Sequence, residues 1–316
     1  MILKSYCVNI AVSDLEAATR RYEEILGHDA IAMEQVLGAG GKNPGAALPV
    51  GGVYYLGLVA ASEKPDPGSD DLVARHLAIR GEGACMVGLL VDDIDAQAET
   101  LAQRGVKTTT ATPVEVGIGR SLFTDPEQTG GTVLQFTQLG DPEGTEQLWS
   151  DRAQSATRRR AYQAYVLDIA VGDLDASAAV YASAFGFDPI PMPDGADPSE
   201  SMDATHFTVG GPADNNVGGL YAIGLMTPRG APKGPIPKAV GDYLSAHGDG
   251  SFLVAFLTES LEKQIDHLGS LGIKLCYDEP MRYVHGRLQM TEPVHGVWLD
   301  FAQHDHDAFE RWQSGE

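Results

Sequence analysis

Apolar and polar residues follow two different periods at the start of the chain. Residues 8–12 (VNIAV) alternate and are rich in β-branched side chains, which predicts a strand. From Leu15 to Leu26 the apolar residues recur at helical spacing, and Gly27 follows where a left-handed residue can end a helix. The pattern therefore predicts a strand, a turn and a helix, in this order.

Three stretches of the chain occur twice. The segment 8–27 (VNIAVSDLEAATRRYEEILG) returns 159 positions later at 167–186 (LDIAVGDLDASAAVYASAFG), with the same D-L pair, tyrosine and closing glycine. A second repeated stretch, which also combines an apolar strand with a helical pattern, is 86–107 with 253–274. A third, a single closing strand, is 130–138 with 295–303. Repeats of this kind predict two similar halves, each built from two modules.

The length of 316 residues is typical of about two domains. We expect the first domain over residues 1–142 and the second over residues 160–306. The segment 143–159 is rich in Asp, Glu, Gln, Ser and Arg and poor in strand-forming residues. We therefore predict that it is a linker.

The charge of the chain argues against some classes of partner. Lys and Arg number 22 against 44 Asp and Glu, a net charge of −22, whereas nucleic acids and anionic membranes are bound through basic surfaces. No apolar run reaches the roughly 18 residues that a membrane span needs. The start of the chain lacks the features of a signal peptide, and the cysteines, Cys7, Cys85 and Cys276, form no paired framework. We expect a cytoplasmic protein.

The repeated motifs also resemble a known group of proteins. The segments NIAVSDLEAATRRYEEILG, LLVDDIDAQAETLAQRGV and GRSLFTDPEQTGGTVLQF, with their second-half partners, resemble the vicinal oxygen chelate superfamily. This group contains glyoxalase I, methylmalonyl-CoA epimerase, bleomycin-resistance proteins and extradiol dioxygenases. The resemblance implies an α+β fold of four βαβββ modules, paired into two half-open barrel domains that each surround a cup. It does not specify the reaction, because one fold hosts many chemistries.

In metal-dependent members of the superfamily, the ligands come from the first and last strands of the two modules of a cup. The corresponding positions here are Asn9, Gly57, Met86 and Gln135 in the first cup, and Asp168, Gly224, Leu253 and Asp300 in the second. Transition metals are held by imidazole, thiolate or converging carboxylates. Gly, Met and Leu supply none of these, so we predict no metal and no other cofactor. The open alternative is a metal in the second cup, which would require His206 or His285 to join the two aspartates.

The two cups differ in acid–base chemistry. If residue 168 faces the second cup, strand alternation places Val166 and Ala170 beside it and turns Leu167 and Ile169 away. Two carboxylates in an apolar setting cannot both ionise easily, so one of them suits a proton transfer to or from carbon. The alternative is that Asp168 and Asp300 only hydrogen-bond the backbone or a water molecule.

The leading hypothesis is an isomerase or lyase that acts on a small oxygenated molecule. Its catalytic residues would be Asp168 and Asp300, with His285 or Tyr283 as an orienting donor. The candidate ligand-binding residues are Trp298, Leu253, His206, Gln289, Arg287, Asn9, Gln135, Met86 and Tyr55. Two alternatives stay open: a protein that sequesters a small molecule without chemistry, and a degenerate relative of the extradiol dioxygenases. In each case the expected partner is a small molecule, bound by a monomer or a homodimer.

Overall fold

The computed structural model describes residues 1–38, 41–51, 54–156, 162–186, 189–191, 202–209, 222–230, 235–278 and 284–304. Within these ranges, only the backbone is described at 162–165, 190–191, 235–236, 277–278, 284–287 and 304.

The first half of the chain forms one eight-stranded mixed sheet with the strand order β2-β3-β4-β1-β5-β8-β7-β6. Its strands are β1 (Ile2–Ala11), β2 (Ile31–Ala32), β3 (Gly45–Pro49), β4 (Tyr55–Val59), β5 (Gly83–Val91), β6 (Val114–Val116), β7 (Gly119–Phe123) and β8 (Val133–Leu139). Its helices are α1 (Leu15–Leu26), α2 (Glu34–Leu37), α3 (Leu72–Arg80), α4 (Ile94–Gln103) and α5 (Pro142–Ala156).

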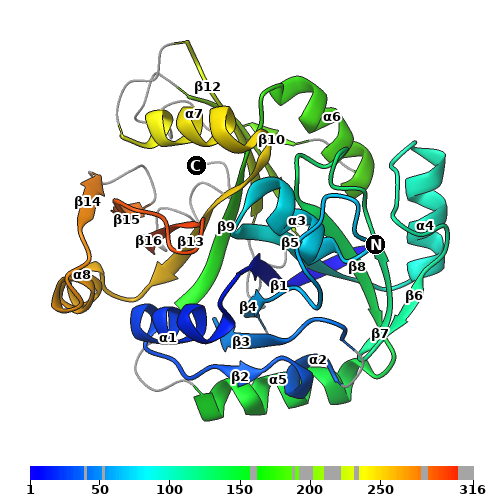
Figure 1. Ribbon diagram of the computed structural model, residues 1–316, viewed down its shortest axis with the longest axis horizontal. Helices are drawn as coiled ribbons and strands as arrows, with labels where there is room; N and C mark the ends of the chain where they lie inside the picture. Colours follow the sequence, from blue (N-terminus) through cyan, green and yellow to red (C-terminus); the bar gives the residue numbers. More distant parts are fainter. Residues whose placement is uncertain are drawn as a thin grey trace, which may run out of the picture.

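The second half repeats this sheet with the order β10-β11-β12-β9-β13-β16-β15-β14 (Figure 1). Its strands are β9 (Tyr162–Ala170), β10 (Ile190–Pro191), β11 (Met202–Thr208), β12 (Ala222–Pro228), β13 (Gly250–Thr258), β14 (Leu275–Asp278), β15 (Val284–Met290) and β16 (Trp298–His304). Its helices are α6 (Leu174–Phe185), α7 (Pro235–His247) and α8 (Leu261–Ser270).

Each sheet contains two modules of one strand, one helix and three further strands. Modules 1 and 2 begin at β1 and β5, and modules 3 and 4 begin at β9 and β13. In each sheet the first strands of the two modules pair antiparallel at the centre, β1 with β5 and β9 with β13. The predicted fold class, four paired βαβββ modules, is confirmed.

The first helix of each half begins and ends in the same way. The Asp14 side chain accepts a hydrogen bond from the Ala17 amide, and Asp173 accepts the corresponding bond from Ala176. Gly27, with φ 68°, ends α1 in the left-handed conformation that glycine adopts without a steric penalty. The strand, turn and helix expected from the repeated motif are therefore present twice.

One segment differs from the sequence-based expectation. The segment predicted to be a linker is mostly the helix α5, which packs on the first sheet through Trp149.

The outer faces of both sheets and the helices that cover them share one hydrophobic core. The Tyr22 hydroxyl of α1 donates to the carbonyl of Val294 in the second half, at 3.0 Å. In the counterpart of this contact, the Tyr181 hydroxyl of α6 donates to the carbonyl of Thr129, also at 3.0 Å. The two halves are therefore joined by matching contacts, with a tyrosine of each half buried against a turn of the other.

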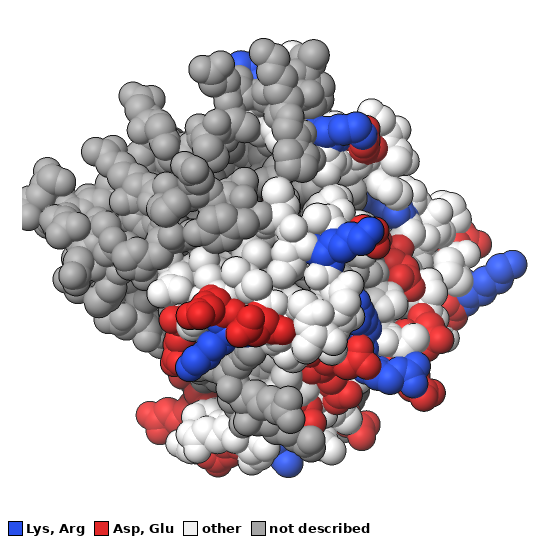
Figure 2. All heavy atoms as spheres, turned by 90° about the vertical axis from the view of Figure 1, so that its left-hand side faces the viewer, with Lys and Arg blue, Asp and Glu red and all other residues white. Residues whose placement is uncertain are grey.

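Acidic side chains gather over the lower part of the face drawn in Figure 2, with Lys and Arg scattered among them. This agrees with the net charge of −22. None of the helices in the described ranges has the length and apolar character needed to cross a lipid bilayer.

A buried histidine predicts how stability depends on pH. Burial and the nearby positive charges of Arg80 and His247 lower the pKa of His76, on α3, to about 3. Between about pH 6.5 and pH 3 the unfolded chain therefore binds a proton that the folded chain does not, and the folded state loses stability as the pH falls. The loss approaches 1.4 kcal/mol per pH unit, or up to roughly 2 kcal/mol between pH 6.5 and pH 5.

Denaturant unfolding at pH 7 and pH 5 measures this effect. We expect His76→Gln to reduce the difference between the two pH values relative to the parent chain. A smaller contribution remains, because burial also lowers the pKa of His28. An unchanged difference in His76→Gln would contradict the assignment.

Candidate functional site

The inner face of the second sheet lies on the side of the sheet opposite the shared core. Val166, Ala170, Leu253 and Ala255 form one apolar cluster there, against which Trp298 packs. The alternate residues of β9, Leu167 and Ile169 among them, belong to the shared core instead. The alternation expected from the sequence is therefore present, and this cluster defines the second inner face.

Asp168 lies at the centre of the second inner face, in the strand β9. It pairs with Gly224 of β12 on one side and with Leu253 of β13 on the other. A Cβ atom at Gly224 would lie 2.0 Å from Asp168 Oδ1 and 2.9 Å from His206 Nε2. Residue 224 is therefore a glycine because the Asp168 side chain, reaching toward His206, occupies the space of a side chain there.

His206 of β11 is an ionisable neighbour of Asp168. It pairs with Gly224, and its Nε2 lies 3.7 Å from Asp168 Oδ1. The Asp168 side chain is 8% exposed and that of His206 is 21% exposed. The aspartate is thus the buried member of the pair, and the histidine reaches toward solvent.

Asp300 lies on the same face, at the far side of β13. It pairs with Ala255 of β13 and with Gln289 of β15, and it is 1% exposed. Asp168 and Asp300 are separated by one intervening strand and by two residues along it. In a flat sheet this places their Cα atoms roughly 10 Å apart across the strands and about 7 Å apart along them.

The inner face of the first sheet has the same strand pairing but different side chains. Asn9 pairs with Gly57 and Met86, and its Nδ2 lies 3.7 Å from Met86 Sδ. A Cβ atom at Gly57 would lie 2.1 Å from Asn9 Oδ1, which repeats the arrangement at Gly224. Gln135 donates to the hydroxyl of Ser121 at 3.2 Å.

The register shows which residues replace one another between the halves. Gly57 pairs with Ala47, the position that His206 occupies in the second half. Asn9 is replaced by Asp168, and Gln135 by Asp300, so three neutral positions become two acids and a histidine. At these three aligned positions, the carboxylates and the imidazole lie on the second inner face.

The first inner face is covered by α5. Trp149 stacks on Tyr6 with ring centroids 5.4 Å apart, and its indole nitrogen donates to the Val36 carbonyl at 2.7 Å. The Tyr55 hydroxyl donates to the Trp149 carbonyl at 2.5 Å. Tyr55, a candidate ligand-binding residue, thus lies under a helix. In the sequence, the sign that this segment packs against the sheet is a single tryptophan, Trp149, among mostly polar residues.

The fold family implies a metal, but the described residues do not fit one. The Leu253 side chain is a hydrocarbon, and the Asp168 side chain fills the space that a ligand at residue 224 would need. The described residues contain no group of three or more His, Cys, Asp or Glu side chains arranged to hold an ion. Burial raises the pKa of the Cys7 and Cys85 thiols to about 12, so neither is a thiolate near neutral pH.

The side chains of three candidate residues lie outside the described part of the structure. His285 and Arg287 lie in β15, where only the backbone is described, and Tyr283 lies outside the described residues. Gln289 of the same strand is 3% exposed and adjacent to Asp300. Of the candidates, the structure therefore brings together Asp168, His206, Asp300, Gln289, Leu253 and Trp298 on one face.

Comparisons with known proteins agree with this architecture. The family described as "Glyoxalase-like domain" matches residues 8–157. A mutant of 4-hydroxymandelate synthase from Streptomyces coelicolor is 16% identical, with a TM-score of 0.68 over 96% of this chain and 93% of that one. A xylose isomerase-like TIM barrel/4-hydroxyphenylpyruvate dioxygenase fusion protein is 14% identical, with a TM-score of 0.62 over 97% of this chain and 50% of that one.

A shorter match covers part of the chain. Methylmalonyl-CoA epimerase from Mycobacterium tuberculosis is 25% identical over 45% of this chain and 91% of that one, with a TM-score of 0.36. No curated protein matches the sequence.

Proposed function

The chain carries the vicinal oxygen chelate fold, and we propose that its second inner face binds a small oxygenated organic molecule and moves a proton on it. The reaction class that fits is that of an isomerase or a lyase. The observation that carries the proposal is the paired difference between the halves, in which Asn9 and Ala47 are replaced by Asp168 and His206.

The Asp168 carboxylate is the proposed base. A carboxylate that is shielded from water and close to an imidazole can take a proton from a carbon next to a carbonyl group. His206 lies 3.7 Å from it and positions it, favouring the ionised form whenever the imidazole is protonated.

Asp300 is the proposed acid. It lies on the same face, beside Gln289, and it is buried. Returning the proton to a different carbon or to the opposite face gives an isomerase, and giving it to a leaving group gives a lyase. The hydrocarbon body of the substrate would lie against Leu253 and Trp298, which line the same face.

Proton exchange with solvent tests the proposal without requiring the natural substrate. A panel of small α-hydroxy ketones, 2-oxo acids and 2-hydroxy aldehydes in D2O is followed by proton NMR for loss of the signal next to the carbonyl. We expect catalysed exchange with at least one compound, reduced about 100-fold or more by Asp168→Asn, because a positioned base contributes at least this factor.

The first half supplies the matched control. Asn9→Asp places the same carboxylate at the corresponding position of the first inner face, where Ala47 replaces His206. We expect it neither to add exchange activity nor to restore it in the Asp168→Asn chain. Binding without exchange, at equal affinity in Asp168→Asn, would contradict the catalytic proposal and favour sequestration of a ligand.

A further inference from the structure

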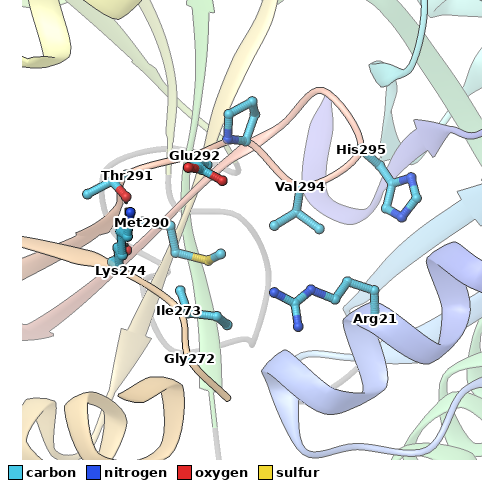
Figure 3. Close-up of a pocket in the computed structure, with 10 residues that line it drawn as sticks. Arg21, Gly272, Ile273, Lys274, Met290, Thr291, Glu292, Val294 and His295 are labelled. Atoms are coloured by element: carbon cyan, nitrogen blue, oxygen red, sulfur yellow. Dashed lines mark hydrogen bonds between the residues drawn. The ribbon is translucent and has the colours of Figure 1, made fainter. Parts of the chain in front are cut away.

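A cavity of about 500 Å³ lies between the two halves, away from both inner faces. Arg21 of α1 forms one wall, and Ile273, Met290, Thr291 and Val294 of module 4 are among the residues of the other (Figure 3). Its volume is in the range of small-molecule sites, about 300–1,000 Å³. Nothing in the proposed proton transfer uses these residues.

At the corresponding place between modules 2 and 3, the side chain of Gln128 binds the backbone. Gln128 accepts a hydrogen bond from the Lys107 amide at 2.6 Å and donates to the Gly105 carbonyl at 3.0 Å. The residues that match Lys107 and Gly105 in the repeat are Lys274 and Gly272, and both line the cavity.

The turn that carries Gln128 is shorter in the second half. The Asp125 and Thr291 amides donate to the carbonyls of Lys107 and Lys274, at 3.0 and 3.1 Å, so these two positions correspond. Thr129 and Val294 also correspond, because both accept the buried tyrosine bond. Three residues lie between Asp125 and Thr129, but only two, Glu292 and Pro293, lie between Thr291 and Val294. Gln128 therefore has no counterpart in the second half.

The cavity also gains a cation. Arg21 occupies the repeat position of Val180, and its guanidinium group points into the cavity toward Ile273 and Val294 (Figure 3). One of its nitrogens lies 3.3 Å from Glu24 on the same helix, which leaves further donors of the guanidinium for a ligand. A basic group that faces an open, partly apolar cavity favours an anionic ligand.

We propose that this cavity binds a small organic carboxylate, with its charged group on Arg21 and a short hydrocarbon body against Ile273, Met290 and Val294. Glu292 also lines the cavity, and its carboxylate weakens the binding of an anion. Because Arg21 belongs to the first half and the other named residues to the second, the ligand joins the two halves and stabilises their packing.

The test uses the full chain, labelled with 15N, and three probes: hexanoate, hexan-1-ol and inorganic phosphate. Hexanoate at up to roughly 10 mM, enough to detect a Kd of millimolar order, is expected to shift the backbone amide signals of Gly272 and Ile273 to saturation. Hexan-1-ol tests the need for charge, and phosphate tests the need for the hydrocarbon body. We expect both to bind at least about 10-fold more weakly than hexanoate, because each lacks one of the two interactions.

Three variants identify the residues. Arg21→Ala should weaken hexanoate about 10-fold or more, since a hydrogen bond to a charged group is lost, and Glu292→Gln should strengthen it. Arg20→Ala removes the same charge from an exposed neighbour on α1 and should leave binding unchanged. Equal weakening by Arg20→Ala, equal affinity for phosphate, or no shift at either amide would each overturn the proposal.

Discussion

Replacing Trp149 with alanine is expected to lower the free energy of unfolding by about 3–5 kcal/mol, the range for removing a fully buried tryptophan. Trp149 is 0% exposed and is held by two aromatic contacts, stacked on Tyr6 and edge-on to Tyr55. The substitution also leaves the Val36 carbonyl without its indole donor. The helix α5 would then lose its largest apolar contact with the first sheet.

Denaturant unfolding measures the effect, and the same helix provides the control. Leu148 precedes Trp149 and is 40% exposed, so Leu148→Ala should change stability by less than about 0.5 kcal/mol. Indole should partly restore Trp149→Ala by filling the space and should not stabilise the parent chain, since a ligand stabilises only the state that binds it. A loss below about 1 kcal/mol would mean that α5 does not depend on this residue.

Replacing Gly296 with alanine is expected to destabilise the fold by about 2–5 kcal/mol, the sum of two effects. Gly296 has φ 76°, and a left-handed conformation costs about 1–2 kcal/mol for a residue with a Cβ atom. That atom would also lie 1.8 Å from the Glu82 carbonyl oxygen, in the other half of the chain. The resulting displacement adds about 1–3 kcal/mol.

Gly272 separates the two effects. Its φ of 72° is nearly the same, but a Cβ atom there would meet no other atom within 4 Å. Gly272→Ala should therefore cost only the conformational part, about 1–2 kcal/mol. Gly131, the counterpart of Gly296, would place a Cβ atom 2.3 Å from the Asp249 carbonyl oxygen, and its substitution should resemble Gly296→Ala. Equal losses at residues 296 and 272 would show that the contact between the halves is unimportant.

Much of the architecture was predictable because the sequence motifs act locally and occur in both halves of the chain. The capping aspartates, the helical spacing and the closing glycines each act within a few residues. Their repetition identified four modules, and the strand pairing confirms them. The resemblance of the motifs to a superfamily implied the aligned positions, and the register places Asp168 beside Gly224 as that alignment required.

The tertiary structure alone decided what lies against these positions. The segment expected to be a linker is instead a helix over the first sheet, because Trp149 finds its partners far along the chain, in Tyr6 and Val36. The proximity of His206 to Asp168 depends on the pairing of β11 with β12, for which no local pattern exists. The sequence determined the modules through short-range periodicity, whereas long-range packing determined that α5 covers the first inner face and that His206 lies beside Asp168.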